Sequence, residues 1–208
     1  VLVASSNIIA YAVGKDDHGE IHQALLSSML IAVTLAILCG IGLWFVSGVL
    51  GYLGQAPNSI ENVEVYLRSV LWMLLPALGF MALRNFSLGM GRAGSILKIT
   101  LVGAICNFPI SYALMKGVWF LPELGLKGIG YGTVVVSFLM FFAFIWDLYR
   151  SPTFKPYPFW SGWDEFRIGS VMPILRLGIP MAIAYAMEAG LFTAAAVLVG
   201  MIGEIELA

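Results

Sequence analysis

Long apolar runs separated by short polar stretches dominate the sequence. A helix needs about 20 mostly apolar residues to cross a bilayer. The pattern predicts five complete spans, at about residues 23–50, 63–83, 95–115, 133–150 and 180–200, after the apparent end of an earlier helix at residues 1–13. A membrane β-barrel would show alternating segments of about ten residues instead. The expected fold class is therefore all-α, that of a polytopic helical membrane protein.

Three prolines fall in or at the start of predicted spans: Pro76, Pro109 and Pro180. A proline inside a helix lacks the amide hydrogen that would bond to the carbonyl four residues earlier, and it bends the helix. We expect structural kinks at all three positions. At Pro109, the carbonyl oxygen of Ile105 is left free for a side chain, a water molecule or a cation.

The basic residues are distributed unequally over the polar stretches that separate the spans. Because successive loops alternate sides, one side carries eight basic residues, Lys15, Arg84, Arg92, Lys98, Arg150, Lys155, Arg167 and Arg176. The other side carries Arg68, Lys116 and Lys127. The positive-inside rule makes residues 14–22, 84–98 and 150–176 cytoplasmic. Arg84 and Arg92 are interpreted as topology and fold determinants at that edge rather than as substrate ligands.

Composition supports the membrane assignment and excludes several functions. The chain is 60% hydrophobic and 11% charged, whereas soluble domains contain about 25% charged residues. A net charge of −1 offers no basic field for nucleic acid. A membrane enzyme would need clustered catalytic groups at one face, and the charged cluster at residues 15–22 lacks that spacing. His18 and His22 in this cluster are expected to be surface residues with no role in metal binding.

The polar segment at residues 151–172 is the longest one between spans. It contains Pro152, Pro156 and Pro158, which disfavour a continuous helix. Its later half, residues 163–169, has the composition of a short interfacial helix.

Glu188 stands near the middle of the last apolar run. An ionised carboxylate at that depth costs at least ~2.5 kcal/mol on insertion scales. The side chain must therefore be protonated, paired, or facing water inside a helix bundle. Two interpretations remain open: a protonated carboxyl group that hydrogen-bonds to a neighbouring helix, or a group that binds a coupling ion.

Asn107 and Ser111 lie four residues apart, on one helix face, and flank Pro109. They either satisfy the backbone locally at the proline kink or form part of a polar site inside the membrane. The sequence alone leaves both alternatives open.

Three stretches, taken in order, resemble the multidrug and toxic compound extrusion (MATE) family, in particular its NorM-type bacterial branch. The first is residues 82–92, Ala-Leu-Arg-Asn-Phe-Ser-Leu-Gly-Met-Gly-Arg. The second is Asn-Phe-Pro-Ile-Ser at residues 107–111, followed by the glycine-rich residues 121–133. The third is residues 176–192, which contain Glu188. Together these stretches extend over nearly the whole chain.

The resemblance implies part of a twelve-helix transporter with two lobes. Residues 1–150 would form the N-terminal lobe from the end of its second helix to its sixth. Residues 151–172 would form a cytoplasmic linker between lobes, and residues 173–208 the first helix of the C-terminal lobe. The chain is expected to be a fragment, and its partners would include the missing helices 1, part of 2, and 8–12.

The resemblance also implies a function. It points to an antiporter of the cytoplasmic (inner) membrane that exports amphipathic or cationic compounds, driven by H⁺ or Na⁺ and without a cofactor. Glu188 would bind the coupling ion or the substrate, facing Asn107 and Ser111 across a central cleft. Asn107, Ser111 and Thr133 would form the polar site of the first lobe, and Na⁺ could bind at either place. Some relatives carry a carboxylate or an amide where Ser111 stands, so the resemblance implies a weaker ligand set at this position.

One alternative is a lipid-linked precursor flippase of the same broad superfamily. Such flippases have more cationic cavities that hold pyrophosphate. Here only Arg68, Arg84 and Lys98 lie near the predicted spans, which favours the antiporter.

Overall fold

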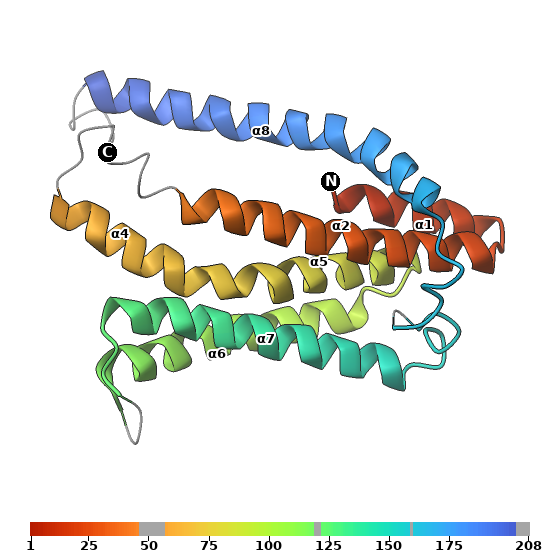
Figure 1. The fold of residues 1–208 in the computed structure, drawn as a ribbon, viewed down its shortest axis with the longest axis horizontal. Helices are drawn as coiled ribbons and strands as arrows, with labels where there is room; N and C mark the ends of the chain where they lie inside the picture. Colours follow the sequence, from red (N-terminus) through yellow and green to blue (C-terminus); the bar gives the residue numbers. More distant parts are fainter. Residues whose placement is uncertain (46–56, 119–121, 159, 203–208) are drawn as a thin grey trace.

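A computed structural model describes residues 1–45, 57–118, 122–158 and 160–202, and these residues form helices and turns without a strand (Figure 1). The helices are α1 (Val3–Gly14), α2 (His18–Trp44), α4 (Pro57–Val70), α5 (Leu74–Gly89), α6 (Gly94–Lys116), α7 (Leu126–Arg150) and α8 (Val171–Ile202). Two short 3₁₀ turns, η1 (Leu71–Met73) and η2 (Ile168–Ser170), precede α5 and α8. The all-α prediction is confirmed.

Five helical stretches in the described part of the chain are long and apolar enough to cross a membrane: His18–Trp44, Val63–Gly89, Gly94–Lys116, Leu126–Arg150 and Ile168–Ala195. The shorter helix α1 is also apolar. The predicted pattern of five spans and one partial helix is therefore confirmed. Residues 46–50, assigned to the first span from sequence, lie outside the described residues.

The loops rich in basic residues gather at one end of the helix bundle, which we call the basic end. It is formed by the α1–α2 turn, the α5–α6 turn and the segment between α7 and α8, all at the right of Figure 1. The α6–α7 connection lies at the opposite end. This arrangement agrees with the alternation of loops that the charge distribution predicted.

The buried core lies toward the basic end. It combines Ile9 of α1, Leu25 of α2, Phe86 of α5 and Phe144 of α7, all at most 1% exposed. The residues of the first family-like stretch contribute directly. Asn85 is buried and its Nδ2 atom donates to the Leu2 carbonyl oxygen at 3.1 Å, which ties α5 to the start of α1.

The three predicted kinks differ in the structure. The helical interruption near Pro76 lies at η1, one turn before the proline. Pro76 has no amide hydrogen, so it cannot donate to the carbonyl oxygen of Trp72, which lies inside η1. Pro109 and Pro180 instead lie inside helices α6 and α8, whose assignments continue through them.

The glycine-rich residues 128–132 are helical. The sequence predicts that this helix begins only near Thr133, after the glycines. Helix α7 begins at Leu126 and contains them. A Cβ atom on Gly128 would lie 2.5 Å from the Leu114 carbonyl oxygen, and one on Gly132 would lie 2.6 Å from the Ser111 Cα atom. In membranes, small residues allow two helix backbones to approach closely. These glycines therefore form the contact surface of α7 for α6.

The prediction of an interfacial helix at residues 163–169 is wrong. Residues 163–167 form turns and irregular backbone, and only η2 follows before α8. The backbone bonds there are turn-like, such as Phe166 N–H to the Trp163 carbonyl oxygen at 3.3 Å. Side-chain contacts with α2, described below, hold this segment in place of helical hydrogen bonds.

Substitution of Gly132 by alanine should separate α6 from α7, because the new methyl group would collide with the Ser111 backbone. In the whole protein we expect a loss of about 1–3 kcal/mol of stability, the usual cost of overpacking. Thermal unfolding in detergent measures it. Gly42→Ala is the matched control, since nothing lies within 4 Å of a Cβ atom at Gly42. Equal melting temperatures for the two variants would contradict the close contact.

Candidate functional site

Three of the predicted site residues lie at the contact between α6 and α7. Ser111 packs against Gly132, the residue before Thr133. Further along the same pair, a Cβ atom on Gly103 would collide with the Met140 side chain. Asn107 is four residues from both Gly103 and Ser111, so it shares their side of α6. The structure thus brings Asn107, Ser111 and Thr133 to one helix pair.

The two hydroxyl groups of this site differ in their hydrogen bonding. Thr133 Oγ1 donates to the Ile129 carbonyl oxygen of its own helix at 3.1 Å. Ser111 Oγ is buried and has no hydrogen-bond partner among the described residues. A buried polar group left without a partner costs about 1–3 kcal/mol. Ser111 therefore retains a donor and two acceptor positions for a ligand, a water molecule or another part of the protein.

Glu188 lies away from that group. It is exposed on α8, as are all residues of α8 from 183 to 195. Helix α8 packs on α1, α2 and η2, whereas α6 packs on α7. Figure 1 accordingly draws α8 and α6 on opposite sides of the bundle. The described residues therefore do not place Glu188 opposite Asn107 and Ser111, as the sequence had suggested.

Arg84 and Arg92 lie at the basic end. Arg84 is half-buried on α5, and Arg92 follows the helix in an exposed turn. The Arg92 N–H donates to the Ser87 carbonyl oxygen at 2.9 Å, and the Arg92 carbonyl accepts from the Ser87 hydroxyl. The backbone of Arg92 therefore closes the α5–α6 turn, and the role of the two arginine side chains in topology stays a prediction.

Sequence reasoning missed a set of contacts that fastens the α7–α8 segment to the start of α2. The His18 Nδ1 atom and the Tyr157 hydroxyl group are hydrogen-bonded to each other. His22 Nε2 donates to the Pro158 carbonyl oxygen at 3.0 Å. The described residues contain no group of three or more His, Cys, Asp or Glu side chains that could hold a metal ion. The two histidines instead form hydrogen bonds that hold the α7–α8 segment against α2.

Gln23 extends this attachment with both ends of its amide. Its Nε2 atom donates to the Glu165 carbonyl oxygen at 3.0 Å, and its Oε1 atom accepts from the Arg167 N–H at 3.0 Å. Burial, aided by the negative charge of Asp16, raises the pKa of Tyr157 above its ordinary value. Tyr157 therefore stays protonated and able to donate throughout the physiological pH range.

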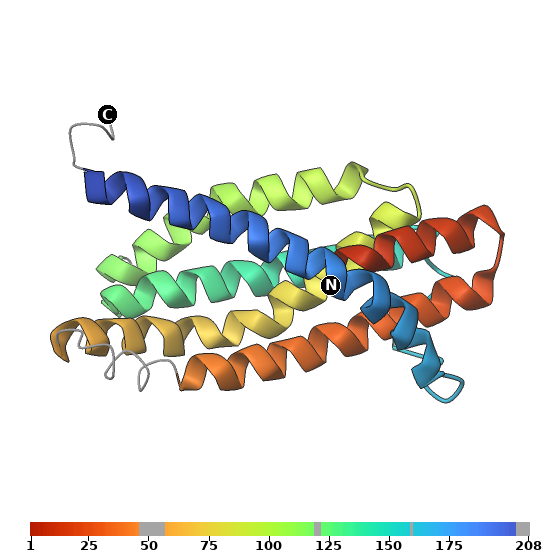
Figure 2. The same ribbon diagram turned by 90° about the horizontal axis from the view of Figure 1, so that it is seen from above.

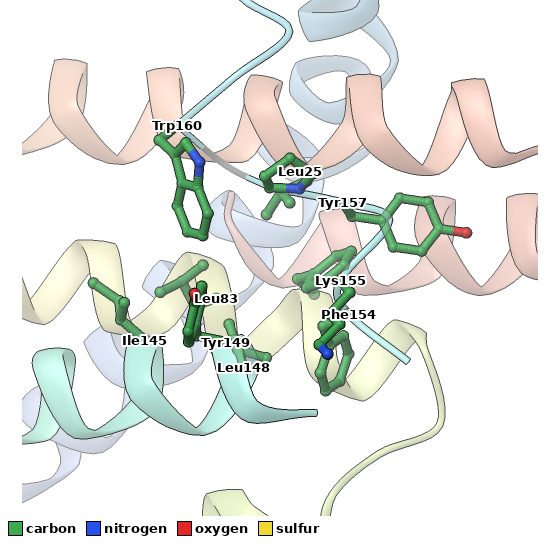
Figure 3. Close-up of a pocket in the computed structure, with 11 residues that line it drawn as sticks. Leu25, Leu83, Ile145, Leu148, Tyr149, Phe154, Lys155, Tyr157 and Trp160 are labelled. Carbon is green, nitrogen blue, oxygen red and sulfur yellow. The ribbon is translucent and has the colours of Figure 1, made fainter. Parts of the chain in front are cut away.

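A small cavity beneath this attachment is shown in Figure 3, lined mainly by apolar side chains of α5, α7 and the α7–α8 segment. Its volume is about 70 Å³, whereas pockets for drug-sized ligands measure about 300–1,000 Å³. Phe154 and Tyr157, each 6% exposed, are among the side chains that line it. The cavity is a packing gap of the attached segment and is too small for a drug-sized substrate.

Sequence comparison decides the family. The model of the MatE family matches residues 1–113, more than half of the chain. The chain belongs to the MatE family. A probable multidrug resistance protein NorM of Pseudomonas syringae pv. tomato is 32% identical over 208 residues, which are 100% of this chain and 45% of that protein. The corresponding NorM protein of Pseudomonas aeruginosa is 33% identical over 100% of this chain and 43% of its own length.

The MatE chain thus spans less than half the length of these curated relatives. Its fold also resembles a solved structure described as an inward-facing conformation of a multidrug resistance MATE family transporter of the MOP superfamily. The TM-score is 0.74 at 18% identity, over 86% of this chain and 40% of that one. This similarity shows that the helix arrangement is that of a MATE fold.

Replacing Gln23 by alanine should loosen the segment before α8, because the Arg167 amide loses its acceptor and the Glu165 carbonyl its donor. One exposed hydrogen bond contributes about 0.5–1.5 kcal/mol. The Arg167 amide should therefore exchange with deuterium roughly threefold to tenfold faster. Hydrogen-exchange mass spectrometry of the whole protein measures this. Thr34→Ala, which removes a hydrogen bond within α2 only, should leave the exchange of residues 163–170 unchanged.

Proposed function

We propose that this chain is part of an antiporter that exports organic cations or other amphipathic compounds, driven by inward movement of H⁺ or Na⁺. Membership in the MatE family and the names of the NorM relatives support multidrug export. The proposed protein is a transporter rather than an enzyme, and it needs a coupling ion instead of a cofactor. Its surroundings are the cytoplasmic (inner) membrane, with the basic end in the cytoplasm.

The observation that carries the proposal is the position of Glu188. It lies inside the apolar stretch Ile168–Ala195 and is not packed against the described helices. An ionisable group at such depth is costly, and it persists where it faces the interior of a protein or a water-filled cavity. A carboxyl group in that position can accept H⁺, bind Na⁺ or attract a cationic substrate.

The packing of α8 suits alternating access. In its first half, α8 contacts the beginning of the chain so closely that a Cβ atom on Gly178 would lie 2.8 Å from the Val1 Cα atom. Ile174 is fully buried there, whereas residues 183–195 are exposed. In both views α8 passes the N-terminus part-way along its length, and its later part extends away from α1 (Figures 1 and 2). Alternating access in secondary transporters is largely rigid-body rocking of one repeat against the other, and α8 would move with its own lobe.

We further propose that Asn107, Ser111 and Thr133 form a second polar site, in the first lobe. The buried Ser111 hydroxyl without a partner among the described residues supports this. Hydroxyl and carbonyl oxygens are ligands for Na⁺-like hard cations and for water. The division in which residues 1–150 form this lobe and residues 151–172 the linker is part of the same proposal.

Replacement of Glu188 by glutamine should abolish coupling, because glutamine keeps the size of the side chain but can neither take up a proton nor carry a negative charge. The whole protein is reconstituted in vesicles, and efflux of a fluorescent organic cation is measured under an imposed H⁺ or Na⁺ gradient. We expect at least a tenfold loss in the rate of gradient-driven efflux, equivalent to a transport barrier about 1.4 kcal/mol higher.

Glu123→Gln is the matched control, because Glu123 is an exposed carboxylate outside the spans. It should keep full efflux. Efflux that needs no gradient in the unmodified protein, or that survives in Glu188→Gln, would refute the antiport proposal.

Replacement of Ser111 by alanine separates the two interpretations of that residue. If the hydroxyl group binds nothing, its removal should be neutral or should stabilise the protein by about 1 kcal/mol, since a buried unpaired group disappears. If it contributes to a polar site, ion-driven efflux should fall several-fold without loss of stability. We expect the second result. Ser137→Ala is the control: its hydroxyl donates to the Thr133 carbonyl oxygen at 2.8 Å, and its loss should leave efflux unchanged.

A further inference from the structure

The basic end contains a second, more polar cavity of about 350 Å³. Three cationic side chains line it from three segments: Arg92 of the α5–α6 turn, Lys98 of α6 and Arg150 at the end of α7. The hydroxyl-bearing residue Ser95 also lines it. We propose that this cavity binds the phosphate group of an anionic phospholipid whose acyl chains lie along α6.

The charges in the cavity favour an anion. Asp147 is the one carboxylate among its lining residues, against three cations, so an excess of two positive charges remains. Across the described residues, the ion pairs with nitrogen and oxygen within 4.0 Å involve His18 with Asp16 and Arg68 with Glu64. None of the three cations of the cavity is therefore neutralised by such a pair.

The start of α6 strengthens the attraction. Gly94 and Ser95, the first two residues of this helix, line the cavity. The residue before them, Ala93, provides no side-chain cap, so the first amide groups of α6 keep their donors free. Free amide groups and the helix dipole favour a negatively charged group at this point. They add to the three basic side chains, which carry most of the charge.

An apolar surface continues from the cavity along α6 and identifies the ligand as a lipid rather than a free phosphate. Leu101, Val102 and Ile105 follow Lys98 at helical spacing and are 57%, 60% and 64% exposed. Beside the cavity, the Arg150 guanidinium carbon lies 5.3 Å from the ring centroid of Trp146. Tryptophan rings are typical of the depth at which headgroups meet acyl chains. A soluble anion would gain nothing from the apolar surface.

The test measures lipid binding to the whole protein in a neutral detergent by native mass spectrometry. Phosphatidylglycerol and phosphatidylcholine of equal chain length are supplied together. We expect bound phosphatidylglycerol to exceed phosphatidylcholine clearly. Because each basic side chain near an anionic headgroup changes affinity by roughly fivefold, Arg92→Gln combined with Lys98→Gln should lower this preference by about tenfold or more.

Two further variants keep the outcome interpretable. Arg92→Lys combined with Lys98→Arg conserves both charges and should keep the preference. Lys116→Gln combined with Lys127→Gln removes two cations from the opposite end and should also keep it. An unmodified protein that binds both lipids equally, or a preference lost only in the Lys116 and Lys127 variant, would overturn the proposal. Full displacement of the lipid by an equal concentration of glycerol 3-phosphate would overturn the lipid assignment.

Discussion

The arrangement of these helices depends on close approach at small residues. In a bilayer, burying an apolar side chain between helices gains little, because the lipid is equally apolar. Association then rests on van der Waals packing, which is densest where a glycine lets two backbones come together. Gly128 and Gly132 do this between α7 and α6, Gly89 between α5 and Ile9 of α1, and Gly178 between α8 and Val1. These contacts decide which polar groups become neighbours.

The helical spans could be predicted from hydropathy because a bilayer demands runs of apolar residues with satisfied backbones. The gathering of basic loops at one end followed from the same alternation. The glycines at 128–132 were harder, since glycine marks a turn in a soluble domain and a packing surface in a membrane helix. Nothing in the local sequence shows whether these glycines form a turn or a packing surface. They form a packing surface here because α6 lies against them.

The attachment of the α7–α8 segment to α2 could not be predicted for a related reason. His22 and Pro158 are 136 residues apart, and Gln23 and Glu165 are 142 apart. Histidine, glutamine and proline in polar loops have no periodic pattern that announces a contact over such distances. Among the site residues, the spacing of Asn107 and Ser111 indicated a shared face, but the register that places Ser111 beside Gly132 is a property of the packed helix pair.

The same packing suggests a division of roles between the two polar groups. Ser111 and Thr133 belong to a tightly packed helix pair, α6 and α7. If this pair moves as a unit, the positions of the two residues relative to each other stay the same. Glu188 belongs to the part of α8 that is not packed against the described helices, so its surroundings would change if α8 moved with the second lobe of the proposed transporter. A ligand shifts a conformational equilibrium only by the difference between its affinities for the two states. If the proposed function holds, ion binding at Glu188 would bias the conformational equilibrium, whereas the α6–α7 site would keep the same shape in both states.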